Sequence, residues 1–466
     1  MILDQYYLSC LSHASYLVAD EDSGLAAIVD PQRDIDQYLE DAKSNGLTIK
    51  YVILTHFHAD FLAGHIELRE RAGAEIVMAR RATSEFSVRH VSDGERIELG
   101  PKVALEFMET PGHTPEGLSV LVYDRTGSET VPHAVLTGDT LFVGDVGRPD
   151  LLASIGVTAD ELAAMLYDSI FNKISKLPDS TLVYPAHGAG SMCGKNLGQD
   201  LHSTIGEQKR FNYAMKPMSF SQFKQIVTED QPEAPDYFVH DAILNRQERP
   251  ALENAMTVAI KPIRLEKVIE MSGLGAQLLD VRDGLDYAGS HLTGSINIAL
   301  KGKYATWAGS MLNSKDPIIV IGDQDQVEEA VMRLGRIGFD NAVGYLEDGM
   351  KALENHPELE RKTRRITAQA LADMIASGEK VVVIDVRSEK EYAGGHIDNS
   401  INIPVTHLVD KLGLLPKDSP IVVHCEGGYR SSIASGIMMN HGFKQVVDLV
   451  GGYKAWAASS STCQLP

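Results

Sequence analysis

The sequence predicts an α/β protein of three domains, a larger one followed by two smaller ones that resemble each other. Its 466 residues are too many for one hydrophobic core and suffice for roughly three domains of 100–200 residues. An internal repeat occupies the second half of the chain. Within each copy, short β-branched runs alternate with helical patterns, which favours a mainly parallel sheet covered by helices.

The composition is that of a globular protein with an acidic balance. Hydrophobic residues make up 44% and charged residues 23%, and 43 basic against 64 acidic residues give a net charge of −21. This charge argues against nucleic acid and anionic membranes as partners. No apolar run approaches the roughly 20 residues of a membrane span, and the N-terminus lacks the pattern of a signal peptide. We therefore expect a cytoplasmic protein, with a homo-oligomer as its assembly.

Apolar runs in the first half predict strands, each followed closely by histidine, aspartate or glycine. These runs are 26–29, 52–54, 134–136 and 182–184. A helix is predicted from Thr158 onward, because Thr158 and Glu161 form a capping box. The apolar stripe of this helix comprises Leu162, Met165, Leu166, Ile170 and Ile174. Strands that end in polar residues at one rim are a common way to build a site on a rigid sheet.

Four turns of this half carry candidate metal ligands beside glycines that permit sharp turns. The candidates are His56, His58 and Asp60 in "THFHADF", His113 in "TPGHTPEG", Asp139 in "TGDTLF" and His187 in "YPAHG". Two histidines and one carboxylate on one face of an octahedron form the facial triad of non-haem Fe(II) oxygenases. A zinc site would instead lower the pKa of a bound water and catalyse hydrolysis. The residue types permit either metal.

The motif series H-x-H-x-D, G-H-T-P, G-D and P-A-H resembles the metallo-β-lactamase superfamily, and within it the persulfide dioxygenases, with glyoxalase II-type hydrolases as near relatives. The resemblance implies an αββα sandwich over residues 1–250. It also implies one Fe(II) per chain, with zinc as the alternative, held by His56, His113 and Asp139. His58, Asp60 and His187 would then orient the ligands or a water.

Two further positions bear on this resemblance. Phe61 stands where the two-metal hydrolases carry another histidine, and it cannot coordinate a second metal. Arg148 and Asp150 in "GRPD" stand where the dioxygenases carry an arginine and an aspartate. Arg148 could bind a substrate carboxylate or brace its loop, and a structural salt bridge with Asp150 is the alternative.

The four cysteines are widely spaced and are predicted to be free thiols in a reducing compartment. Cys193 is predicted to precede a helix, whose N-terminus together with Lys195 would lower the pKa of the thiol. It could accept sulfane sulfur or form a mixed disulfide, or it could be an ordinary loop residue. Cys10 is predicted to lie in a core strand, and Cys463 lies in the tail without a predicted role.

The internal repeat defines the two smaller domains. "LLDVRDGLDYAGSHLTGSINIAL" (278–300) matches "VIDVRSEKEYAGGHIDNSINIPV" (383–405), and "RIGFDN" (336–341) matches "NHGFKQ" (440–445). We predict homologous domains at 259–355 and 364–466. The charged segment 354–367 is predicted to link them, and the polar segment 228–253 to wrap the first domain.

"HCEGGYRSS" (424–432) follows a predicted strand and opens a helix. The six residues from Cys425 to Arg430 can curl so that successive N–H groups point at the sulfur. Together with the helix N-terminus and Arg430, they would stabilise a thiolate or a bound persulfide. C-x-G-G-x-R resembles the rhodanese family. The resemblance implies that Cys425 and Arg430 are catalytic and that the substrate contacts Glu426, Gly427, Gly428 and Tyr429.

The first copy of the repeat lacks this thiol. Its counterpart reads "VIGDQDQVEEA", which places Gly322 opposite Cys425. Asp323 and Asp325 would repel an anion. We therefore predict a non-catalytic rhodanese-like domain that serves as a spacer or docking surface.

Together these sites predict an enzyme of sulfide detoxification. The iron site would oxidise a low-molecular-weight thiol persulfide with dioxygen and water to sulfite and thiol. Cys425 would transfer sulfur between persulfide, sulfite and thiosulfate, in either direction. One alternative is a zinc-dependent, glyoxalase II-like thioester hydrolase fused to a sulfurtransferase. A second alternative is a non-catalytic module that senses persulfide or carries sulfur.

Overall fold

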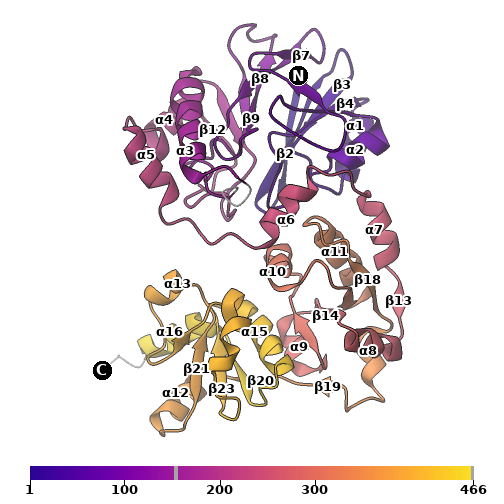
Figure 1. Cartoon of the computed structure of the whole chain (residues 1–466), viewed down its shortest axis with the longest axis vertical. Coiled ribbons are helices and arrows are strands. Elements are labelled where there is room, and N and C mark those ends of the chain that lie inside the picture. Colours follow the sequence, from indigo (N-terminus) through magenta and orange to yellow (C-terminus); the bar gives the residue numbers. More distant parts are fainter. Residues whose placement is uncertain (152–155, 463–466) are drawn as a thin grey trace. The chain divides into compact units, whose positions relative to one another are not determined.

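The computed structural model describes residues 1–151 and 156–462, and it divides into two compact units (Figure 1). The first unit comprises Met1–Leu252 together with Gly335–Gly338. The second comprises Glu253–Leu334 and Phe339–Pro466 and contains both copies of the repeat. Cys463 lies outside the described residues.

The first unit contains two six-stranded sheets. The strands of the first sheet, in spatial order, are β1 (Ile2–Leu8), β2 (His13–Asp20), β3 (Leu25–Val29), β4 (Thr48–Ile53), β5 (Glu75–Ala79) and β6 (Arg89–Val91). Those of the second are β12 (Ser203–Thr204), β11 (Leu182–Pro185), β10 (Ala134–Gly138), β9 (Leu118–Asp124), β8 (Val103–Glu109) and β7 (Arg96–Glu98).

The two sheets pack face to face, and helices cover their outer faces (Figure 1). Because side chains alternate along a strand, Val120 and Val122 of β9 enter the core between the sheets, whereas Leu121 faces the helices. The helices of this unit are α1 (Asp36–Ser44), α2 (His65–Ala72), α3 (Ala159–Asp168), α4 (Ile205–Phe211), α5 (Phe220–Thr228) and α6 (Tyr237–Leu244). The arrangement is the predicted αββα sandwich.

The capping box at the start of α3 is confirmed. Thr158 accepts a hydrogen bond from the backbone of Glu161, whose side chain bonds back to the backbone of Thr158. The helix continues as a π-helical turn (Ser169–Lys173) and a 3₁₀ turn (Ile174–Lys176). Along this length Leu162, Leu166, Ile170 and Ile174 are buried against the second sheet. Four of the five predicted stripe residues therefore face the core, and the fifth, Met165, is only half-buried.

The second unit contains two five-stranded sheets whose neighbouring strands are parallel. The first has the order β13 (Pro262–Ile263), β18 (Ala342–Leu346), β17 (Ile318–Ile321), β14 (Gln277–Asp280) and β16 (Ser295–Asn297). The second has the order β20 (Arg364–Ile366), β24 (Val446–Leu449), β23 (Ile421–His424), β21 (Val382–Asp385) and β22 (Ile401–Asn402). We call the first the Cys-less domain and the second the Cys425 domain.

Helices surround both sheets. In the Cys-less domain they are α8 (Leu265–Gly273), α9 (Gly284–Gly289), α10 (Tyr304–Met311) and α11 (Gln324–Gly335), preceded by α7 (Leu252–Ala259). In the Cys425 domain they are α12 (Ala368–Ala376), α13 (Glu389–Ala393), α14 (Leu408–Lys411), α15 (Tyr429–Asn440) and α16 (Gly452–Thr462). The parallel sheets with their helices confirm the fold predicted for the repeat.

Two segments that the sequence analysis left without regular structure contain it. The predicted linker 354–367 includes β19 (Glu360–Arg361), which pairs with β15 (His291–Leu292), and β20, an edge strand of the Cys425 domain. The segment 228–253 includes α6 and the start of α7. As expected, the segment 228–253 belongs to the first unit up to Leu252. The strands within 354–367 were not predicted, because a short edge strand has too few residues to show a periodic pattern.

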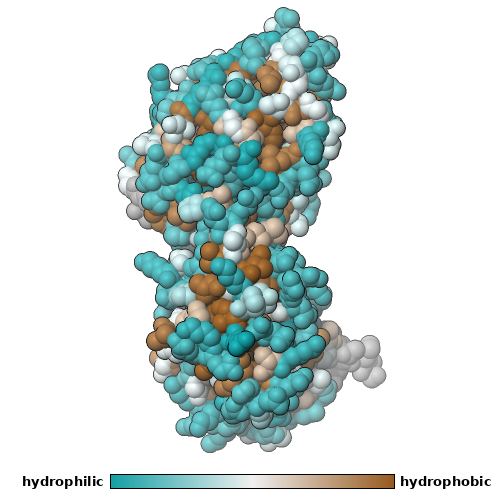
Figure 2. Space-filling model, turned by 90° about the vertical axis from the view of Figure 1, so that its right-hand side faces the viewer, coloured by the Kyte–Doolittle hydropathy of each residue, from teal (hydrophilic) through white to brown (hydrophobic). Residues whose placement is uncertain are grey.

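Hydrophilic residues dominate the face of the molecule drawn in Figure 2, in keeping with the acidic composition. Among the residues that the structure describes, no helix combines the length and the hydropathy that a bilayer span requires.

Candidate metal centre and sulfur-transfer site

The candidate metal ligands lie in loops that follow strands of both sheets. Strands β3 and β4 are parallel, as are β10 and β11, so their carboxyl ends open at one rim. The loop after β4 supplies His56, His58 and Asp60, and the loops after β8, β10 and β11 supply His113, Asp139 and His187. All six side chains are buried.

His56, His113 and Asp139 form the first cluster, with ligand atoms that lie within 4.8 Å of one another. The Nε2 atom of His113 is 3.4 Å, and that of His56 3.9 Å, from Asp139 Oδ2. Gly138 makes the turn before Asp139 possible, because its φ is +52° and an added Cβ would lie 2.5 Å from Thr55 Oγ1.

The burial and the hydrogen bonding of this cluster favour the binding of a cation. His113 Nδ1 lies 2.9 Å from the carbonyl oxygen of Arg148, to which it can donate, so that Nε2 remains a lone-pair donor towards Asp139. Burial, together with the neighbouring histidines, lowers the pKa of His56 well below its usual value. Both carboxylate oxygens of Asp139 are buried without a hydrogen-bond partner. Two imidazoles and one carboxylate without a hydrogen-bond partner are a donor set that a divalent metal ion would satisfy.

His58, Asp60 and His187 form a second cluster, whose candidate ligand atoms also lie within 4.8 Å of one another. His187 Nε2 lies 3.4 Å from Asp60 Oδ2 and 3.6 Å from Asp139 Oδ1, so Asp139 stands between the two clusters. The ring of Phe61 packs against that of His58 with centroids 4.4 Å apart. The second cluster therefore retains three possible ligands although Phe61 replaces a histidine.

Asp30, which the sequence analysis did not single out, organises the first of these turns. It follows β3 and accepts hydrogen bonds from the backbone and hydroxyl of Thr55 at 2.8 and 2.7 Å. Its Oδ1 atom also lies 3.0 Å from His58 Nε2. Burial opposes protonation of His58, but the carboxylates of Asp30, Asp139 and Asp60 together outweigh it and raise the pKa of that histidine. The sequence could have indicated Asp30, because this aspartate directly follows the predicted strand 26–29.

Asn245 is a second residue that the sequence analysis missed. It is buried at the end of α6, and its Nδ2 donates to the carbonyl oxygens of His58 and Phe61, both at 2.8 Å. Its Oδ1 accepts from the backbone N–H of Ala63 at 2.9 Å. Three backbone groups of the loop that carries His58 and Asp60 therefore depend on one side chain.

Replacing Asn245 with alanine is expected to lower metal affinity about 10-fold, because residues that support ligands typically contribute 10–100-fold. Metal content after dialysis against graded chelator measures the effect. The matched control is Asn212→Ala, which also removes bonds from a buried asparagine to two carbonyl oxygens, those of Phe142 and Asp145. Equal metal loss in both variants would contradict the assigned role.

Arg148 is engaged within the protein. Its guanidinium forms a bidentate pair with Asp150 at 2.7 and 2.6 Å and also donates to the carbonyl oxygen of Pro232 at 2.6 Å. The side chain is 5% exposed. This geometry fits the structural alternative better than direct contact with a substrate carboxylate. Arg148 thereby fixes the loop whose carbonyl oxygen lies against His113.

The expectation of a helix after Cys193 was wrong, since residues 193–202 have no regular structure. The amino group of Lys195 donates to the carbonyl oxygens of Ile226 and Glu229. Burial, reinforced by the carboxylates of Asp60 and Asp139, raises the pKa of the Cys193 thiol. Its sulfur nevertheless lies within 4.8 Å of candidate ligand atoms of Asp139 and His187, at the candidate metal centre.

Cys10 also differs from expectation. It lies in the turn between β1 and β2 and is partly exposed, so it is not a core strand residue.

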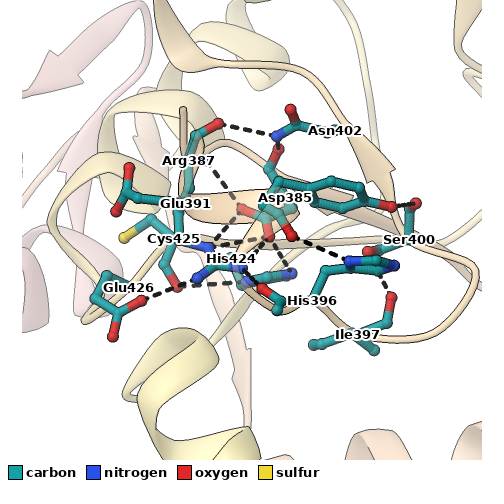
Figure 3. A network of polar contacts seen from close by, with 12 residues as sticks. Asp385, Arg387, Glu391, His396, Ile397, Ser400, Asn402, His424, Cys425 and Glu426 are labelled. Atoms are coloured by element: carbon teal, nitrogen blue, oxygen red, sulfur yellow. Dashed lines mark hydrogen bonds and ion pairs between the residues drawn. The ribbon is translucent and has the colours of Figure 1, made fainter. Parts of the chain in front are cut away.

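The Cys425 loop joins β23 to α15, as predicted (Figure 3). The thiol is 1% exposed, and the backbone N–H of Gly428 donates to its sulfur at 3.1 Å. Gly428 has a φ of +112° and forms the N-cap of α15, a conformation that favours glycine. Glu426 and Gly427 are exposed, whereas the hydroxyl of Tyr429 donates to the carbonyl oxygen of Ala299.

The two arginines near Cys425 are already paired with carboxylates. Arg430 donates to both oxygens of Glu391 at 2.6 and 2.7 Å. Arg387 bonds to buried Asp385 and also reaches Glu426 at 3.1 Å (Figure 3). Burial opposes ionisation of Glu391, but the bonds from Arg430 and from its own N-cap lower its pKa to about 2. The guanidinium of Arg430 is therefore half of an ion pair with Glu391.

In the Cys-less domain, Gly322 follows β17 as Cys425 follows β23, so the predicted correspondence is correct. An added Cβ at Gly322 would lie 2.8 Å from the Val281 side chain. The position therefore has little room for a side chain, and this domain has no thiol at the place that corresponds to Cys425.

Known protein families match the first unit and the two copies of the repeat separately. Residues 8–187 match the metallo-beta-lactamase superfamily, and residues 265–356 and 367–459 each match the rhodanese-like domain. The mitochondrial persulfide dioxygenase ETHE1 of Homo sapiens is 33% identical over 221 residues, 46% of this chain and 75% of that protein. A hydroxyacylglutathione hydrolase of Polaromonas sp. is 31% identical over 175 residues, 37% of this chain and 61% of that protein.

Among solved structures, a metallo-beta-lactamase from Staphylococcus aureus subsp. aureus COL aligns with a TM-score of 0.66 at 32% identity. The alignment covers 74% of this chain and 98% of that one. It therefore extends beyond the first unit of this chain.

Proposed function

Because the chain belongs to the metallo-beta-lactamase superfamily and carries two rhodanese-like domains behind that fold, we propose that it is a persulfide dioxygenase joined to a sulfurtransferase. The substrate of the first site is a low-molecular-weight thiol persulfide, RSSH. The overall reaction is RSSH + O₂ + H₂O → RSH + HSO₃⁻ + H⁺. The observation that carries the proposal is the pairing of a buried two-histidine, one-carboxylate cluster with a cradled cysteine in one chain.

In this proposal His56, His113 and Asp139 hold one Fe(II). The metal supplies open coordination positions and the redox chemistry for reaction of the persulfide with dioxygen. Asp30 holds the ring of His58 beside this cluster, and Asn245 holds the loop to which His58 belongs. The buried surroundings exclude bulk water from the ligands.

Cys193 remains a candidate for direct contact with the sulfur of the substrate. Its thiol lies beside Asp139 and His187, the residues that link the two clusters. In exchange with RSSH it would form a Cys193 persulfide and release RSH, which needs no other oxidant.

At the second site, the Cys425 thiolate attacks the outer sulfur of RSSH, which forms a Cys425 persulfide and releases RS⁻. Sulfite then takes the outer sulfur as thiosulfate and regenerates the thiolate. The same steps in reverse make persulfide from thiosulfate. Gly428 N–H and the N-terminus of α15 stabilise the sulfur anion in either direction.

One alternative has its own support. The second cluster, His58, Asp60 and His187, together with the similarity to hydroxyacylglutathione hydrolases, fits a zinc-dependent thioester hydrolase joined to the sulfurtransferase.

Anaerobic purification, metal analysis and oxygen-electrode assays test the proposal. We expect about one iron per chain and oxygen uptake with glutathione persulfide, with sulfite formed in equal amount. Two zinc ions per chain, with hydrolysis of a glutathione thioester and no oxygen uptake, would favour the hydrolase. Sulfur loading of Cys425 without release of sulfite or thiosulfate would favour a carrier module.

A further inference from the structure

The helix that follows Cys425 is held by the Cys-less domain as well as by its own sheet. α15 packs against β23 and β24 of the Cys425 domain and against β16 and α9 of the Cys-less domain. Figure 1 shows α15 beside α9. Its residues from Ser431 to Met438 are all buried. A helix that is buried all round has packing partners on more than one side, and here the second side is the neighbouring domain.

Hydrogen bonds attach this helix to the Cys-less domain along its length. Tyr429, the first residue of the helix, donates from its hydroxyl to the carbonyl oxygen of Ala299 at 2.6 Å. One turn later, Ser432 Oγ donates to Asn297 Oδ1 at 2.7 Å. At the far end, Asn440 Nδ2 donates to the carbonyl oxygen of Gly294 at 2.9 Å.

Hydrogen bonds within the Cys-less domain orient the side chain of Asn297 for this contact. Its Nδ2 donates to the carbonyl oxygens of Asp280 and Arg282 at 3.1 and 2.9 Å, which leaves Oδ1 directed at Ser432. The repeat places Asn402 at the corresponding position of the Cys425 domain, with the same two bonds to Asp385 and Arg387. The Cys-less copy has no thiol at the place that corresponds to Cys425, but its asparagine, which both copies share, binds the helix of the neighbouring domain.

The contact between the domains lies next to the group that donates a hydrogen bond to the Cys425 sulfur. Gly428, whose N–H donates to Cys425 Sγ at 3.1 Å, immediately precedes Tyr429. Gly427 and Gly428 have no side chain to fix their conformation, so their position depends on the residues that flank them. On the C-terminal side that residue is Tyr429, which is anchored outside its own domain.

We propose that the Cys-less domain is a structural part of the sulfur-transfer site. Through Ala299 and Asn297 it positions Tyr429 and α15, so that the N–H of Gly428 points at the Cys425 sulfur. Tyr429 and Ser432 are positioning residues, and Tyr429 does not need to contact the substrate. The inference rests on the proposed sulfur transfer at Cys425, and it assigns a task to the domain that has no cysteine of its own.

The test uses the full-length chain with Tyr429→Phe, which removes only the hydroxyl. The rate of Cys425 labelling by iodoacetamide is followed by peptide mass mapping across a pH series, together with sulfur transfer from thiosulfate to cyanide. We expect the labelling midpoint to rise by about half a pH unit, because a displaced N–H stabilises the thiolate less. We expect kcat to fall about 10-fold, since small displacements at a reacting centre are costly, with KM for thiosulfate changed less than about threefold.

The matched control is Tyr392→Phe, which removes a hydroxyl that donates to the carbonyl oxygen of Ser400 within the Cys425 domain. It loses an equivalent bond, but it should leave the labelling midpoint and kcat unchanged. A second variant, Gly436→Leu, separates the domains without touching the loop. An added Cβ at Gly436 would lie 2.8 Å from Tyr287 Oη and 3.3 Å from Ile296 Cα, both in the Cys-less domain.

Gly436→Leu is expected to shift labelling and kcat in the same direction as Tyr429→Phe. If both variants behave like the Tyr392→Phe control, the inference is overturned. A wild-type protein without sulfur transfer, but with the labelling shift in both variants, would refute the proposed function and leave the positioning role intact.

Discussion

Replacing Asp139 with asparagine is expected to abolish persulfide-dependent oxygen uptake and to remove most of the bound metal. Asp139 is the single carboxylate of the first cluster, its Oδ1 also faces His187, and both its oxygens are buried without a hydrogen-bond partner. The amide keeps the shape but loses the negative charge that balances the cation. Since even residues that only support a ligand contribute 10–100-fold to metal affinity or activity, we expect a loss of at least roughly 100-fold.

Metal content per chain and oxygen-electrode rates measure this effect. The control is Asp124→Asn at the end of β9, where the carboxylate bonds within a turn to Thr126. The control should retain metal and activity. Undiminished oxygen uptake in Asp139→Asn would exclude this cluster as the catalytic centre. Sulfur transfer at Cys425 should persist in Asp139→Asn, because the two sites use different residues.

Replacing Cys425 with serine is expected to reduce thiosulfate:cyanide sulfur transfer by roughly 1000-fold or more, because a hydroxyl cannot carry the transferred sulfur. The loop itself should persist, since the serine oxygen can accept the hydrogen bond that Gly428 N–H now donates to the sulfur. Oxygen uptake with glutathione persulfide should stay within about twofold of the wild type.

Cys10→Ser is the matched control, since it exchanges the same atoms in a partly exposed turn. It should leave both activities unchanged. Retention of sulfur transfer in Cys425→Ser would mean that another thiol accepts the sulfur, and Cys193 would then be the first to examine. Loss of both activities together would instead indicate that the two reactions are coupled more tightly than two separate sites require.

Much of the fold follows from the sequence because its signals are local. The capping box of Thr158 and Glu161 lies within one turn, and the repeat aligns Gly322 with Cys425 after equivalent strands. The candidate ligands that cluster around Asp139 could be identified because each follows a strand run and a turn. Residue type and position after a strand are properties that a linear pattern records.

The helix predicted wrongly after Cys193 and the strand that was not predicted within the linker share a physical cause. The helix predicted after Cys193 fails because the loop is held instead by Asp145, whose carboxylate accepts from the backbone N–H groups of Lys195 and Asn196. The predicted linker proved to contain an edge strand because Arg364 and its neighbours pair with β24, which lies some eighty residues later in the chain. In both cases a distant partner overrides a local propensity.

The sequence by itself determined which chemistry the chain can carry: the histidines and aspartates of the rim, the cysteine loop, and the loss of that cysteine in one copy. Only the tertiary structure decided what holds these groups in place. Asn245 binds the loop of His58 from 187 positions away, and Tyr429 bonds to Ala299 across 130 positions. Such bonds form because packing brings distant elements together, and buried polar groups must then find partners among whatever lies beside them.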